Sequence, residues 1–117
     1  MRAKLKWLGS LEVEDPASWL PDTDEWAIHL RLLAGPADGP GEESFDLVVC
    51  SAGWLGAKAR EQGVVDARHH LVMDGFNWQM VRSYIDQRVS RCEGASWSDV
   101  AEKLARLGYW EFEDYTP

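Results

Sequence analysis

The spacing of apolar residues changes partway along the chain, and this change constrains the fold more than any other feature. In the first half, apolar and polar residues alternate, most clearly at Trp26, Ile28, Leu30 and Leu32. In the last third, apolar residues fall three and four apart, at Trp78, Val81, Ile85, Val89 and Cys92. Alternation is typical of a strand with one buried face, and the longer spacing is typical of an amphipathic helix. The chain is therefore predicted to place its strands first and its main helices last.

Alternation predicts three strands, over residues 5–13, 26–32 and 45–49. A bulge is allowed at Gly9 and Ser10 in the first of them. The glycine- and proline-rich residues 35–41 break the pattern between the second and third strands, which are therefore predicted to form a hairpin with a long loop. A fourth strand is predicted over residues 68–72.

Capping residues mark three helices. Ser51 is positioned to cap a short helix over residues 52–61, which Gly63 ends. A longer helix is predicted over residues 78–92. The Ser96 to Asp99 segment has the form of a capping box and begins a helix over residues 97–107.

Together these elements predict one α+β domain over residues 1–117, because strands precede helices instead of alternating with them. The sheet is expected to be mainly antiparallel, with about four strands, and the two C-terminal helices should pack on one face. In the tail, Trp110, Phe112 and Asp114 share one parity, so the tail is expected to dock on the core.

Charge is concentrated in one loop. The chain has a formal net charge of −8, and residues 12–25 contain six carboxylates but no lysine or arginine. Such a surface repels phosphates, so the sequence predicts no nucleic-acid partner. A basic protein partner would be attracted to it, although improved solubility is an alternative reason for the same charge.

Membrane and secretory features are not predicted. The apolar runs are far shorter than the ~20 residues that span a bilayer. Glu12 interrupts the N-terminal segment before an apolar signal region can form, so a cytoplasmic protein is expected. Cys50 and Cys92 fall at apolar positions and are expected to be reduced structural thiols.

No residue pattern predicts catalysis, a metal or a cofactor. His69 and His70 point to opposite faces of an extended strand, and His29 could be a third ligand only from a neighbouring strand. The pairs Glu12/Glu14 and Glu111/Glu113 suit a solvated face better than an acid–base site. A small hydrolase or metal enzyme that uses these histidines or acids remains an alternative hypothesis.

Seven tryptophans are present, which is many for 117 residues. Four of them, Trp7, Trp26, Trp78 and Trp97, occupy apolar positions of predicted elements and are assigned to the core. Trp19 and Trp54 lie outside the long elements. Each is a candidate anchor for a protein partner, with the alternative that a loop tryptophan folds inward as a lid.

Several segments together resemble the bacterial immunity protein 8 family over roughly residues 3–115. They are residues 45–50 (FDLVVC), residues 53–55 (GWL), the long helix ending near Cys92, residues 96–104 (SWSDVAEKL) and residues 109–115 (YWEFEDY). The resemblance implies an antidote that is encoded beside a polymorphic toxin exchanged between competing bacteria and that binds the toxin domain in the cytoplasm. It supplies no set of functional residues.

The functional hypothesis is therefore an immunity protein that neutralises a cognate and possibly basic toxin through an acidic surface. The residues predicted to contact the toxin are Asp15, Trp19, Asp22, Asp24, Glu25, Glu42, Glu43 and Trp54. The alternative hypothesis is a self-associating interaction module, in which exposed aromatic residues or a strand edge build a homodimer.

Overall fold

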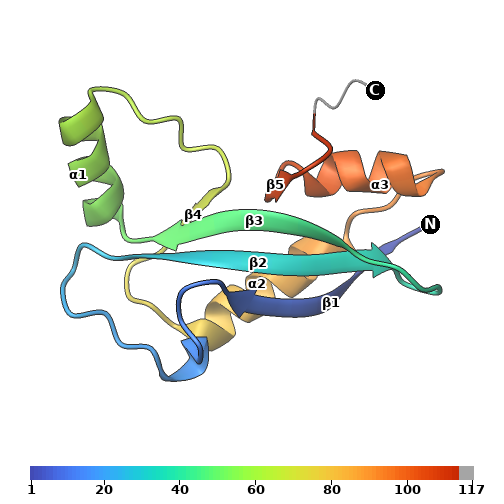
Figure 1. Ribbon diagram of the computed structural model, residues 1–117, viewed down its shortest axis with the longest axis horizontal. Helices are drawn as coiled ribbons and strands as arrows, with labels where there is room; N and C mark the ends of the chain where they lie inside the picture. Colours follow the sequence, from blue (N-terminus) through green and yellow to red (C-terminus); the bar gives the residue numbers. More distant parts are fainter. Residues whose placement is uncertain (114–117) are drawn as a thin grey trace.

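The computed structural model describes residues 1–113 and shows an α+β fold with one five-stranded sheet (Figure 1). The strands are β1 (Ala3–Ser10), β2 (Ala27–Pro36), β3 (Glu43–Cys50), β4 (His70–Val72) and β5 (Tyr109–Trp110). The helices are α1 (Ala52–Gln62), α2 (Trp78–Ser90), α3 (Trp97–Leu104) and the 3-10 turn η1 (Pro16–Ser18). The predicted fold class is confirmed.

The sheet has the order β1-β2-β3-β4. Strand β5 also pairs with β3. The pairs of β1 with β2, β2 with β3 and β3 with β5 are antiparallel, and only the pair of β3 with β4 is parallel. The hairpin of β2 and β3 is therefore the centre of the sheet. The two-residue β5 was not predicted as a strand, because so short a segment has no periodicity.

One face of the sheet forms the core. Register pairs Ile28 with Val49 and Leu32 with Phe45, and these side chains are fully buried. Helix α2 lies behind the sheet in Figure 1 and adds Val81, Ile85 and Val89 to the same cluster. Helix α3 adds Val100, Ala101 and Leu104. Both C-terminal helices therefore bury their apolar stripes in one core, as the spacing of their residues predicted.

Helix caps agree with the sequence. The Ser51 hydroxyl accepts a hydrogen bond from the Trp54 N–H, and Gly63 ends α1 with a positive φ of 83°. The Ser96 hydroxyl accepts from the Asp99 N–H at 3.2 Å at the start of α3. Helices α2 and α3 end at Ser90 and Leu104, two and three residues before the predicted ends.

The first strand differs from its prediction. It ends at Ser10 instead of residue 13, because the Ser10 hydroxyl accepts the N–H groups of Glu12 and Val13 and turns the chain. The bulge lies between Leu5 and Trp7 and not at Gly9 and Ser10. Lys6 is the extra residue, so the alternation of side chains reverses after it.

The apolar side chains Trp7 and Leu11 of the predicted first strand were both expected to be buried, and the reversal and the early end of β1 correct these two predictions. Trp7 is 48% exposed and not a core residue, and Leu8 takes the buried position instead. Leu11, which lies beyond the end of β1, is 59% exposed. The other three tryptophans assigned to the core keep that role: Trp26 is buried, and Trp78 and Trp97 are half-buried against the core cluster.

The tail docks through Trp110, whose ring stacks on Phe45 with 6.3 Å between ring centroids. Phe112 contacts Trp110 edge-on but stays 42% exposed. Asp114 and Tyr115, which the sequence analysis included in this segment, lie outside the described residues. The docking prediction is therefore confirmed for the part of the tail that carries Trp110.

Both cysteines are free thiols. Burial raises the pKa of the Cys50 thiol. Burial also raises the pKa of Cys92, although the cations Arg88, Lys103 and Arg106 act in the opposite direction. Thiols with raised pKa values are poor nucleophiles, so both suit a structural role. Within residues 1–113, no helix has the length and apolar character needed to cross a membrane.

Candidate functional site

Exposed carboxylates gather where β2 begins and β4 ends, and we call this surface the acidic end. It consists of Asp22, Asp24 and Glu25, in the loop before β2, and Asp74, just after β4. Asp24, Glu25 and Asp74 line a shallow depression of about 650 Å³ together with the first residues of α1. Among residues 1–113, Asp22, Asp24 and Asp74 form no salt bridge, and Glu25 reaches Arg60 only at 4.0 Å.

Buried contacts hold the acidic end against the sheet. The Ser51 hydroxyl accepts from the N–H of Trp26, which directly follows Glu25, at 3.1 Å. The Ser51 N–H in turn donates to the Trp26 carbonyl at 2.9 Å. A Cβ atom on Gly53 would lie 3.3 Å from Cγ of Glu25, so the side chain of Glu25 runs along the first turn of α1. The loop is therefore anchored at its C-terminal end.

Trp19 folds inward, which is the lid alternative of the sequence analysis. Its ring packs edge-on against Phe76 and Trp26, with centroid separations of 4.8 Å and 6.0 Å. It is half-buried, so it anchors the middle of the acidic loop, by which we mean residues 12–25, and leaves part of its ring at the surface. Asp15 is exposed earlier in the same loop and accepts a hydrogen bond from the Ser18 hydroxyl at 2.6 Å.

The other predicted contacts lie elsewhere. Trp54 is half-buried on α1, where its ring lies 6.1 Å from the ring of His70. Glu42 and Glu43 are at the far end of the hairpin, because Ala34 pairs with Glu43 and Ala27 pairs with Cys50. At a strand rise of about 3.3 Å per residue, the two ends are roughly 23 Å apart. The predicted residues therefore do not form one patch.

Sequence reasoning missed a second surface, which is the sheet face opposite the core. We call it the open face, since β1, β2 and β3 lie unobstructed in front of α2 in Figure 1. Its members follow from register and include Lys4, Trp7, Gly9, His29, Arg31, Leu33, Gly35, Ser44, Asp46, Val48, His70 and Tyr109. The polar positions of β2 and β3 indicated part of this face. Trp7 was missed because its spacing from Leu5 placed it on the buried face of the first strand.

The charges at the centre of the open face are paired. Arg31 donates from Nε and Nη2 to the two carboxylate oxygens of Asp46, at 2.7 Å and 2.9 Å. These hydrogen bonds to Asp46 raise the pKa of Arg31, and the negative charge of Glu111 acts in the same direction. A bidentate pair of this kind fixes both side chains and neutralises their charges.

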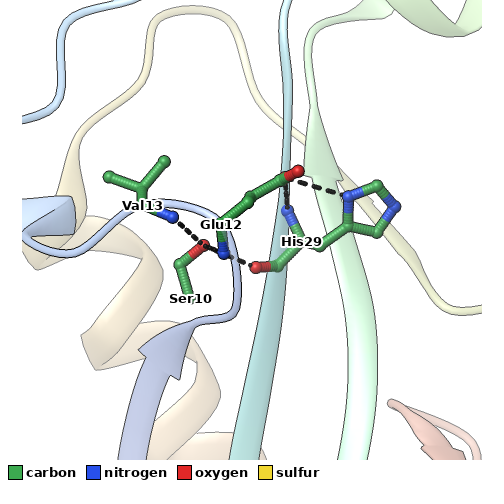
Figure 2. Close-up of polar contacts among 4 residues, drawn as sticks. All are labelled: Ser10, Glu12, Val13 and His29. Carbon is green, nitrogen blue, oxygen red and sulfur yellow. Dashed lines mark hydrogen bonds and ion pairs between the residues drawn. The ribbon is translucent and has the colours of Figure 1, made fainter.

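A second pair forms where β1 ends (Figure 2). One carboxylate oxygen of Glu12 accepts from the backbone N–H of His29 at 2.7 Å and lies 2.9 Å from the Nδ1 atom of the same residue. The hydrogen bond from the backbone N–H lowers the pKa of Glu12, with a smaller contribution from the ring. Glu12 therefore replaces the missing strand partner of β2 at this position.

This contact predicts a pH dependence of stability. Because folding lowers the pKa of Glu12 below its ordinary value of 4.5, its contribution should be complete above that value and lost as the pH falls through the folded pKa. Glu12→Gln should therefore be less stable than the parent protein at pH 7, and the two should converge as the pH falls through the folded pKa of Glu12. Urea unfolding across this range measures the difference, with Glu14→Gln as the exposed control. A difference that does not change with pH would contradict the assignment.

The three histidines contact carboxylate or backbone groups and do not come together in the fold. The Nε2 atom of His69 lies 2.6 Å from the carbonyl oxygen of Ala105, and Nδ1 of His70 lies 2.9 Å from that of Arg68. Val48 separates His29 from His70 in the register, so their strands are not neighbours. In the part of the chain that the structure describes, no three His, Cys, Asp or Glu side chains are arranged to hold a metal ion.

Comparison with known proteins identifies the family. No curated protein sequence and no solved structure matches the chain significantly. Its sequence does match the family model described as immunity protein 8, over residues 3–115. The match covers nearly the whole chain, and proteins of this kind are typically non-catalytic and neutralise toxins. The chain therefore belongs to the immunity protein 8 family.

Proposed function

We propose that this protein neutralises its cognate toxin in the cytoplasm by direct binding, and that the acidic end draws in a basic toxin surface. The observation that supports the proposal most is the gathering of exposed carboxylates from two separate segments, the acidic loop and the turn after β4, around one depression. Solubility alone would be served equally well by carboxylates dispersed over the surface.

The physical role of the acidic end is electrostatic. Charges of one sign on a concave surface raise the local concentration of an oppositely charged partner and speed its association. Because Asp22, Asp24 and Asp74 have no salt-bridge partner within residues 1–113, their charge remains available to a basic toxin. We include Asp15, Glu25 and Trp54 among the contacts, and Trp19 through the accessible part of its ring.

Glu42 and Glu43 belong to the proposal only for a toxin large enough to reach both ends of the hairpin. The Glu43 carboxylate accepts from the Trp97 indole N–H at 3.0 Å, so this side chain already has a structural role. Glu42 is exposed. A contact here would be separate from the acidic end and should be tested separately.

Co-expression tests the proposed function itself. The protein is produced with the toxin domain encoded beside its gene, and growth rescue and co-purification are scored in the same cells. We expect rescue together with a stable complex. If the toxin stays lethal and no complex forms, while light scattering shows a mass that rises with concentration, the self-associating module becomes the better explanation.

Charge reversal tests the acidic end. The triple variant with lysine in place of Asp22, Asp24 and Glu25 should associate with the toxin more slowly, by about tenfold or more at low ionic strength, and with a weaker dependence on salt. Association rates measured between about 20 and 500 mM salt, over which the Debye length falls from roughly 20 Å to roughly 4 Å, would show this loss of steering.

A matched control separates location from total charge. Lysine in place of Asp38, Glu93 and Glu102, which are exposed away from the acidic end, changes the net charge of −8 by the same amount. This control should retain most of the parent association rate. Equal slowing by both variants would show that only net charge matters, and unchanged kinetics in the first variant would place the toxin elsewhere.

A further inference from the structure

We propose that the open face is the surface that anchors the toxin, with Trp7 and Tyr109 seated on an apolar patch of the toxin that is surrounded by basic residues. This inference rests on the proposed function. It assigns the two surfaces different tasks, since the acidic end would speed association and the open face would slow dissociation. None of the eight contact residues predicted from the sequence lies on the open face.

Register places the anchoring residues in one row across the sheet. Gly9 of β1 pairs with Arg31 of β2, Arg31 with Asp46 of β3, and Asp46 with Tyr109 of β5. Paired residues share a face of a sheet, so this row forms a continuous strip. Tyr109 is 54% exposed at one end, and Trp7 is 48% exposed at the other.

Trp7 reaches the row because its ring lies over Gly9. A Cβ atom on residue 9 would be 2.5 Å from two carbon atoms of the Trp7 ring, so only glycine leaves room for this position. The bulge at Lys6 is what directs Trp7 to the open face. Bulges often re-aim a side chain at functional sites, and here the result is a large aromatic ring that lies over Gly9 and is about half exposed to solvent.

Tryptophan, tyrosine and arginine are the residues that most often dominate binding energy at protein interfaces. Here all three occur in one row. Arg31 and Asp46 are already paired with each other, so covering them leaves no uncompensated charge. Beside the row is a depression of about 440 Å³, lined by Leu11, Val48 and His70 among others, which could receive an apolar side chain.

Charge around the row indicates the kind of partner. The pair of Arg31 with Asp46 is neutral, whereas Glu12 and Glu111, which acts electrostatically on Arg31, add negative charge beside it. The exposed cation Lys4 shares the open face but pairs with Gly35, four residues along β2 from Arg31. A complementary partner has an apolar centre and a basic rim. A second copy of this chain would bring the same carboxylates against their equivalents, and each copy has a net charge of −8, so self-association through this face is disfavoured.

The test compares two alanine variants, one of the tryptophan and one of the tyrosine, with a matched control. Trp7→Ala and Tyr109→Ala should each raise the dissociation constant for the toxin domain, and Trp7→Ala should do so by about 30-fold or more. The increase should lie mainly in the dissociation rate and should be the same at low and high salt. Tyr84→Ala is the control, because Tyr84 is 47% exposed on α2, outside the open face, and should leave the constant unchanged.

A second variant keeps the aromatic ring. Gly9→Ala should displace the Trp7 ring from the strand and raise the dissociation constant in the same direction as Trp7→Ala. Because the clash involves only the outer end of the Trp7 side chain, circular dichroism and the urea midpoint should stay close to those of the parent. Weaker binding with an intact fold would therefore report the position of the ring.

The outcomes distinguish failure of the proposed function from failure of this inference. If the parent protein forms no complex with the toxin, both the proposed function and this inference fail. If the parent binds and Trp7→Ala, Tyr109→Ala and Gly9→Ala all bind equally well, the function stands and the inference is overturned. If the parent is a dimer that Trp7→Ala converts to a monomer without weakening toxin binding, a second copy occupies the face and the inference is also overturned.

Discussion

Phe45→Ala is expected to lower the free energy of unfolding by about 3–5 kcal/mol, the largest stability effect that we predict. Phe45 is completely buried in the central strand β3. Its ring is opposite Leu32 in the register and stacks against Trp110, and a Cβ atom on Gly108 would lie only 3.0 Å from the Phe45 Cβ. Truncation would therefore leave a cavity that backbone contacts on the Gly108 side keep from collapsing.

Urea unfolding followed by circular dichroism measures this effect. Ser44→Ala, at the adjacent position of the same strand on the open face, should change the free energy of unfolding by no more than about 0.5 kcal/mol. If Phe45→Ala is too unstable to purify, Phe45→Leu should remain folded and lose less stability. A loss below about 1 kcal/mol for the alanine variant would show that β3 is not the centre of the core.

The elements that could be predicted are those whose signal is local. Alternation in β2 and β3 and the three- and four-residue spacing in α2 depend on one segment at a time. Ser51 and Ser96 begin helices through their own hydroxyl groups. These features therefore identified the fold class without any knowledge of which strands pair.

The features that could not be predicted depend on pairing between distant segments. The bulge at Lys6 exists only relative to β2, and the apolar spacing of β1 fits Trp7 into the core as well as it fits Leu8. Strand β5 has two residues and is defined by its register with β3. A one-residue shift moves a side chain to the other face of a sheet, so a local pattern cannot detect it.

The candidate site shows the same division. The acidic end could be predicted because a run of carboxylates without lysine or arginine is visible in the sequence itself. Asp74, however, lies beside these carboxylates only because β4 pairs with β3 in the folded sheet. The open face needs the registers of β1, β2, β3 and β5 together, and Trp7 was assigned to the opposite side of the sheet. The residues that we propose as anchors are therefore those that sequence reasoning placed in the core or left unassigned.

Ser51→Ala is expected to lower the free energy of unfolding by about 2–4 kcal/mol, the second largest stability effect. The Ser51 hydroxyl is buried and accepts two N–H groups, those of Trp54 and Trp26, each at 3.1 Å. Loss of the helix cap costs about 1 kcal/mol. The buried Trp26 N–H would also lose its partner, which adds roughly 1–3 kcal/mol.

Ser96→Ala separates these two contributions. Ser96 caps α3 in the same way but is exposed, and its hydroxyl accepts from the Asp99 N–H, so this variant should lose only the cap, about 1 kcal/mol. The difference between the two variants then measures the Trp26 contact. Equal losses would show that the Ser51 hydroxyl is no more than a helix cap.

The same contact links stability to the proposed toxin surface. Trp26 follows Glu25 directly, and Trp54 lies in the first turn of α1, so one hydroxyl joins the acidic loop to the helix beside it. Ser51→Ala should therefore loosen the acidic end and slow toxin association under conditions in which the variant is still folded. Ser96→Ala, at the start of α3, should not. If Ser51→Ala lost stability but kept the parent association rate, the acidic end would not need this anchor for steering.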